Sequence, residues 1–380
     1  MNRVTVRREL LQWARDRAGR SLEALAGKFP KLPQWERGEA WPTLRQLELF
    51  ARATFVPVGY LFLREPPVER LPVPDMRTTG EGRIGRPSAD LLDTIYLCQR
   101  RQQWYRDWAR SVGEEPRVFV GSVRVDSPVE KAAAAMRAAL GFDLDVRRHW
   151  PTWTEALRHF IAQADGLGVL VMVSGVVGSN NHRKLDPREF RGFAISDDLA
   201  PLVFVNGADT KAAQMFTLAH ELAHLWLGES ALSDVGPASM PTQQIEQWCN
   251  RVAAELLVPL ADLRAQLGAA DPLEEVPRLA RHFKVSTLVI LRRLLDARRF
   301  SREAFGEAYD AELARLLARR GGGGGDFYLT QPARLSRRFA RALVSSTLEG
   351  QTLYRDAFRM LGITKEATFR ELGASLGYTA

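Results

Sequence analysis

The sequence predicts a mostly helical α+β protein, with a small sheet in a central domain, an all-helical domain before it and a helical extension after it. Three observations lead to this prediction. Apolar residues recur every three to four positions through most of the chain, as in amphipathic helices. Val-rich runs at 168–175 and 200–206, with a shorter run at 190–195 between them, are bounded by Gly, Pro or Asn and are typical of strands. Pro-rich and Gly-rich runs separate the parts.

Length and composition exclude several classes of protein. A chain of 380 residues is too long for one ordinary core, which indicates two or three domains. No apolar run approaches the roughly 20 residues of a membrane span, and the first residues lack a secretory signal. We therefore expect a cytoplasmic protein without a membrane partner. Cys98 and Cys249 are too few for a disulfide framework and are expected to be reduced thiols.

The net charge of +8 is compatible with a nucleic-acid or acidic partner. The positive residues are interspersed along the chain and form no dense block. Charge alone therefore identifies no partner.

The first two segments are a helical domain and a linker. Residues 1–66 contain an amphipathic stretch at 9–17 and further helices that begin after Ser21 and Thr43, which are good N-cap residues. Residues 67–80 are rich in Pro and predict a stiff, extended connector.

Residues 81–300 are predicted to form the central domain, with its core at about 160–300. Residues 301–380 are predicted to form the helical extension. Five consecutive glycines at 321–325 act as a flexible spacer there, so residues 326–380 are expected to move separately.

A candidate metal site lies in the helix predicted for KAAQMFTLAHELAHLWLG, residues 211–228. This helix is apolar nearly all round, which predicts that it is buried. Burying two histidines and a glutamate without partners would cost several kcal/mol, and metal coordination removes that cost. His220 and His224 are four residues apart on one helix face, so both imidazoles can reach one ion. Glu221 lies beside them, placed to act as general base.

A catalytic zinc needs a third protein ligand, and the next helix offers two carboxylates. Glu246 and Glu255 are nine residues apart, or about 900° around a helix, so only one of them can face the ion. Small Ala253 and Ala254 allow close approach of the two helices, and Asn250 and Ala253 lie on the face of Glu246. Glu246 is therefore the predicted ligand, and a structural or surface ion pair is the other interpretation of Glu255. The ligand set favours Zn²⁺, with Mn²⁺ and Fe²⁺ as alternatives.

HELAH followed by EQWCNRVAAELLVP resembles the ImmA/IrrE family of cytoplasmic, gluzincin-like metallopeptidases. The resemblance covers about residues 160–300, with Val252 where the family prefers Phe. It implies a gluzincin-like core in which His220, His224 and Glu246 bind the metal and Glu221 is the catalytic base.

The same resemblance implies a function. Members of the family cleave a helix-turn-helix repressor or an antitoxin and so start a stress, phage or mobile-element response. A different hypothesis is a DNA-binding regulator or antitoxin-like partner whose metal site is structural or sensory. The intact Glu221 favours the peptidase, because a structural site needs no base. A third hypothesis is that the extension binds a toxin partner through Tyr354, Phe358 and Leu361, whose other interpretation is a small local core.

Residues 9–63 also resemble the XRE-like, repressor-type helix-turn-helix domain that some relatives carry, on the basis of SLEALA, WERGEAWPTLRQLELFA and VPVGYLF. The segment GKFPKLPQ is shorter than the usual turn and recognition helix. Pro30 and Pro33 in it are expected to interrupt that helix. Two interpretations of this domain therefore remain: it binds DNA, or it makes protein contacts.

Three further segments have alternative interpretations. Residues 277–299 look like a second helix-turn-helix pair with its turn at 285–286, for substrate docking or packing, whose basic residues meet an acidic partner or only solvent. The strand at 201–205 is either a substrate-pairing strand or a core strand. His182 is either an oxyanion-stabilising group or a solvated loop histidine.

Overall fold

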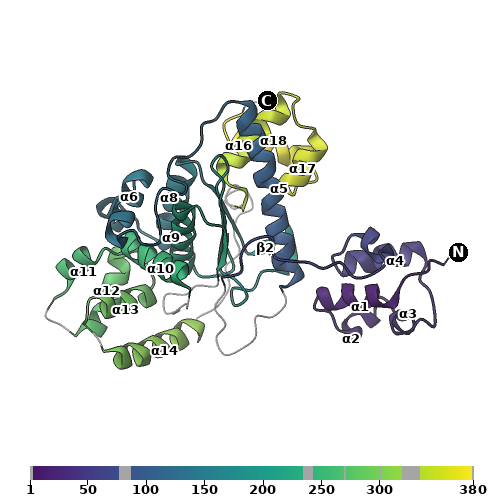
Figure 1. Ribbon diagram of the computed structural model, residues 1–380, viewed down its shortest axis with the longest axis horizontal. Helices are drawn as coiled ribbons and strands as arrows, with labels where there is room; N and C mark the ends of the chain where they lie inside the picture. Colours follow the sequence, from purple (N-terminus) through teal and green to yellow (C-terminus); the bar gives the residue numbers. More distant parts are fainter. Residues whose placement is uncertain are drawn as a thin grey trace. The chain divides into compact units, whose positions relative to one another are not determined.

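The computed structural model describes residues 3–76, 87–233, 243–268, 271–299, 301–318 and 334–378. It contains two compact units, one formed by residues 3–72 with the start of a long helix up to Ile95, and one formed by the rest of the chain. The predicted α+β, mostly helical class is confirmed (Figure 1). No helix within these ranges is long and apolar enough to cross a membrane.

The N-terminal unit is all helical. Its elements are α1 (Arg8–Arg17), α2 (Leu22–Ala26), α3 (Leu32–Arg37), α4 (Leu44–Ala53) and the 3-10 helix η1 (Val58–Phe62). Ser21 caps α2 by accepting a hydrogen bond from the Ala24 amide, and Thr43 forms a capping box with Gln46 at the start of α4. Both predicted helix starts are therefore present.

The helix predicted to be short is present as α3, with six residues, but the expected interruption by Pro33 is wrong. Pro33 lies in the first turn of α3, where a main-chain N–H has no partner within the helix, so the ring causes no loss. The helix is short because Gly38 ends it with φ +77°. Trp35 and Glu36 face the core, and Glu36 accepts a 2.8 Å hydrogen bond from Arg15 on α1.

The second unit is built on a four-stranded sheet of order β1-β5-β4-β6. The strands are β1 (Leu170–Ser174), β5 (Leu202–Asn206), β4 (Gly192–Ile195) and β6 (Ala231–Ser233). β1 and β5 are parallel, and β4 runs antiparallel to β5 and to β6. A hairpin of β2 (Val176–Val177) and β3 (Asn180–Lys184) follows β1. Because β5 pairs on both sides, the strand predicted at 201–205 is a core strand, and the substrate-pairing interpretation of it is wrong.

Helices cover both faces of the sheet. α9 (Lys211–Leu227) packs on β4 and β5, and α8 (Trp153–Gly166) packs on α9 and β1. Figure 1 shows α5 (Ala89–Ser111) on the opposite side of the sheet, where Gln102 donates hydrogen bonds to two main-chain carbonyls. α10 (Gln244–Leu257) lies between α9 and α6 (Val129–Leu140).

Further helices extend this core. They are α7 (Leu144–Arg148), α11 (Leu260–Gln266), α12 (Pro272–Phe283), α13 (Thr287–Asp296) and α14 (Arg302–Ala318). α12 and α13 form the predicted helix pair, and Ser286 caps α13. Arg293 on α13 is buried in an ion pair with Glu255 and is therefore not available to an acidic partner.

The C-terminal helices α16 (Arg337–Leu348), α17 (Tyr354–Leu361) and α18 (Glu366–Ser375) belong to the second unit, where α16 packs on α8 and β1. Arg338 forms an ion pair with Glu114 at 2.8 Å and donates to the hydroxyl of Tyr105. The Arg101 guanidinium donates to the Met360 carbonyl at 3.0 Å. These contacts correct the expectation that the extension moves separately; the glycine spacer itself lies outside the described residues.

The proposed interface stripe on α17 is largely a local core. The Phe358 ring lies 6.0 Å from Tyr354 and 5.7 Å from Phe369, and Leu361 is fully buried. The local-core interpretation of this apolar periodicity therefore holds for Phe358 and Leu361, while Tyr354 remains partly exposed.

Candidate metal centre

Three of the four predicted site residues, His220, Glu221 and His224, lie on α9, whose two ends are both well defined. Thr210 caps α9 by accepting a hydrogen bond from the Ala213 amide, and Gly228 ends the helix with φ +75°. A Cβ atom at Gly228 would lie 3.0 Å from the Cα of Gly121, so only glycine fits there. These features define where α9 begins and ends, and they place its C-terminal end against the main chain at Gly121.

Three of the four predicted site residues bring their ligand atoms to one point. The Nε2 atoms of His220 and His224 are 3.0 Å apart. The Glu246 carboxylate on α10 places Oε2 3.2 Å from His220 Nε2 and Oε1 3.0 Å from His224 Nε2. All three side chains are buried, and their ligand atoms lie within 4.8 Å of one another.

This donor set fits a metal ion. Two imidazoles and one carboxylate are the ligands of many catalytic zinc sites, which keep a fourth position for water. In the described part of the chain, no group other than the two imidazoles faces the Glu246 oxygens as a hydrogen-bond donor. Four buried ligand atoms that face one another without other partners are satisfied by a shared cation.

The charges of the cluster suit metal binding. Burial opposes ionisation of Glu246, but the two imidazoles outweigh it and lower the pKa of this carboxyl to about 2. Burial lowers the pKa of His224, which keeps this imidazole neutral. Burial acts on His220 in the same direction, but the adjacent Glu246 carboxylate raises its pKa. Glu246 is thus an anion ready to accept a cation.

Glu221 lies beside the cluster, and its carboxyl group is buried. Both of its oxygens are buried and receive no hydrogen bond from the described residues. Burial raises its pKa to about 8, although the His220 imidazole and the Ser233 hydroxyl favour the ionised form. A buried carboxyl with a raised pKa next to a metal cluster is suited to accept and release a proton.

The sheet makes room for Glu221 at Gly192 on β4. A Cβ atom at Gly192 would lie 3.1 Å from Glu221 Cγ and only 2.6 Å from Thr217 Cγ2. The sequence predicts a strand here but no role for Gly192 or for Ser233 on β6. The only signal was a glycine inside a strand, which indicates close approach of a neighbouring element.

We expect Gly192→Ala to lower the free energy of unfolding by about 1–3 kcal/mol, because the added methyl group overpacks the contact between α9 and β4. The geometry of the cluster should change as well, since Thr217 and Glu221 must move. Gly306→Ala is the control: nothing lies within 4 Å of its added Cβ in α14. Urea unfolding of both variants tests this, and equal stability for the two would contradict the close contact.

Asn250 also faces the cluster, one turn after Glu246 on α10. Both polar atoms of its amide are buried and form no hydrogen bond with the described residues. His220 Nδ1 is likewise buried and forms no hydrogen bond with the described residues. The Asn250 side chain lies near enough to His220 to favour the protonated imidazole. The sequence placed Asn250 on the face of Glu246, but its proximity to His220 depends on how the two helices pack.

The two remaining candidates lie outside the cluster. Glu255 pairs with Arg293 and accepts a hydrogen bond from the Leu260 amide at 3.3 Å, which ties the end of α10 to α11 and α13. His182 is exposed on β3, and no described hydrogen bond or ion pair joins it to His220 or Glu246. A structural role for Glu255 and a solvated position for His182 agree with these contacts.

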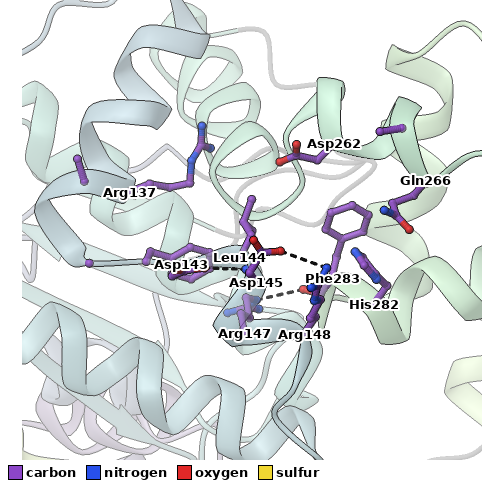
Figure 2. A pocket seen from close by; sticks show the side chains of 14 residues that line it. Arg137, Asp143, Leu144, Asp145, Arg147, Arg148, Asp262, Gln266, His282 and Phe283 are labelled. Atoms are coloured by element: carbon purple, nitrogen blue, oxygen red, sulfur yellow. Dashed lines mark hydrogen bonds and ion pairs between the residues drawn. The ribbon is translucent and has the colours of Figure 1, made fainter.

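A separate hollow of about 640 Å³ lies between α6, α7, α11 and α12 (Figure 2). Arg147 donates from its wall to the Phe283 and Lys284 carbonyls at 3.1 and 3.0 Å, which caps the end of α12. Asp143 caps α7, and Asp145 pairs with Arg148. These four charged groups have partners within the wall, and His220, Glu221, His224 and Glu246 are not among the residues that line the hollow.

Residues 164–295 match the M78 peptidase family, described as an IrrE N-terminal-like domain. Residues 335–375 match a family described as a domain of unknown function. No curated protein matches the chain. The first match spans all four site residues, and the central domain is similar to metallopeptidases of the IrrE/ImmA type.

Proposed function

We propose that this protein is a zinc-dependent endopeptidase that cleaves a regulatory protein of the helix-turn-helix repressor or antitoxin type. The observation that carries the proposal is the convergence of His220, His224 and Glu246 beside the buried carboxyl of Glu221, which receives no hydrogen bond from the described residues. The similarity of residues 164–295 to IrrE-type peptidases supports it.

In this proposal His220, His224 and Glu246 hold the ion, which when bound supplies a Lewis acid for the scissile carbonyl and for a water molecule. Glu221 accepts a proton from the attacking water at its carboxylate and delivers it to the leaving amine. The buried position of Glu221 suits both steps, because a carboxyl with a pKa near neutrality can accept and release a proton.

The N-terminal unit is proposed to make protein contacts that bring a substrate or partner to the chain. Tyr60, Phe62 and Leu63, on and after η1, leave large apolar surfaces exposed. On α3, the exposed Arg37 forms an ion pair with Glu39 at 2.7 Å. This pairing argues against a role for Arg37 in contacting DNA bases.

The proposal is tested by metal content and chelation. We expect purified protein to contain one equivalent of zinc, and removal of zinc by a chelator to lower the thermal midpoint reversibly. An ion that binds only the folded state stabilises it by about 4 kcal/mol at a thousand times its Kd. A metal-free protein whose midpoint does not respond to added zinc would favour the alternative of a regulator or interaction module.

We expect Asn250→Ala to weaken zinc binding by about 10–100-fold, the usual cost of losing a partner that orients a metal-ligating histidine. The proposed role of Asn250 is to accept a hydrogen bond from His220 Nδ1, and Asn250→Asp keeps an acceptor there. Competition titrations with a chromogenic chelator measure both affinities. Equal zinc affinity for Asn250→Ala and the wild-type protein would exclude this role.

A further inference from the structure

The outer edge of strand β6 is occupied by the chain itself. The Met76 amide donates to the Leu232 carbonyl at 3.0 Å, and the Leu232 amide donates to the Pro74 carbonyl at 2.9 Å. Asp75 therefore forms a parallel bridge with Leu232. Val73, at the start of this segment, is only 5% exposed. Residues 73–76 thus add a short extended segment to the sheet beyond β6.

This edge lies beside the proposed general base. On its inner side β6 pairs with β4, and Ser233 is directly opposite Gly192. A Cβ added at Gly192 would lie 3.1 Å from Glu221 Cγ. The Ser233 hydroxyl lies near enough to the Glu221 carboxyl to favour its ionised form. The other edge of the sheet is β1, separated from β6 by two strands. Of these two edges, β6 is therefore the one next to Glu221.

We propose that the outer edge of β6 is where an extended segment of the substrate protein docks by strand addition, and that residues 73–76 occupy this position in the free protein. This inference rests on the proposed peptidase function. Strand addition supplies main-chain hydrogen bonds that do not depend on sequence, together with side-chain pockets that do. The Leu232 N–H and C=O are the groups that the substrate would use.

The contacts of residues 73–76 with β6 are few enough for a substrate to displace this segment. Within the described residues, two main-chain hydrogen bonds join it to β6, and each makes a modest net contribution. Pro72 and Pro74 lack an N–H group and limit further pairing along the edge. A substrate that pairs over more residues competes with this short segment, so binding includes displacement of residues 73–76.

The test uses two zinc-directed probes on zinc-loaded, full-length protein. One is an apolar tripeptide that ends in a hydroxamate, which engages both the metal and a docking strand. The other is acetohydroxamate, which engages the metal alone. Met76→Pro removes the N–H that donates to Leu232, whereas Met76→Ala keeps it. Val73→Asp disfavours the buried position, and Val68→Asp, at an 83% exposed site of the same linker, is its control.

We expect Met76→Pro and Val73→Asp to bind the peptidyl hydroxamate about three- to tenfold more tightly than their controls, the population change given by losing one such interaction. Acetohydroxamate affinity should be equal in all of these proteins. Equal peptidyl hydroxamate affinity throughout would overturn the docking assignment while leaving the metal site intact. If neither probe binds zinc-loaded wild-type protein, the peptidase proposal itself fails.

Hydrogen exchange gives a second readout that needs no variant. In wild-type protein the Met76 amide should be protected by its bond to Leu232, and exchange should accelerate when the peptidyl hydroxamate binds. The Leu232 amide should stay protected, because the probe replaces Pro74 as its partner. A Met76 amide that remains protected with the probe bound would place the substrate elsewhere.

Discussion

Replacing Glu221 with glutamine is expected to lower kcat for cleavage of the proposed regulator substrate by about 10²–10⁴-fold, the range for loss of a general base. Glutamine has nearly the same shape but cannot accept a proton, so the packing of α9 on β4 should survive. Because Glu221 is not one of the three converging ligands, zinc content should remain one equivalent. Single-turnover cleavage assays and elemental analysis on the same preparation measure both quantities.

Glu229→Gln is the matched control for this substitution. Glu229 lies just beyond the end of α9 and is exposed, so its change should leave both cleavage and zinc unaltered. If Glu221→Gln retained most of its activity, another group would have to accept the proton. If it lost zinc together with activity, Glu221 would belong to the ligand set.

Glu246→Gln is expected to weaken zinc binding by at least about 100-fold, more than the loss of an orienting partner costs. Glutamine removes the negative charge that both imidazoles face at 3.0 and 3.2 Å, and a neutral amide oxygen is a poorer zinc ligand. Cleavage should disappear with the metal. Isothermal titration of the metal-free variant with zinc measures the affinity directly.

Glu255→Gln separates metal binding from helix packing, because it changes the second carboxylate of the same helix. This variant should keep its zinc but lose about 1–3 kcal/mol of stability, since the buried Arg293 loses its ion pair with Glu255 and keeps only its pair with the more exposed Asp296. The proposed ligand assignment would be reversed if Glu255→Gln lost zinc and Glu246→Gln kept it.

Local features of this protein could be predicted from sequence because they depend on neighbours within a few residues. The spacing of His220 and His224 places them on one helix face, and the separation of nine positions places Glu246 and Glu255 on opposite faces. Caps such as Ser21 and Thr43 mark helix starts through bonds to their own first turn. Val-rich runs likewise mark strands.

The tertiary structure decided which elements face one another. Hydrophobic periodicity reports that a face is buried but not what covers it, so the docking of α16–α18 on the second unit was not predicted. Strand order depends on contacts between residues distant in sequence, which is why β5 proved to be central. For the same reason, only the packed structure brings Gly192 and Ser233 to Glu221 and seats residues 73–76 on β6.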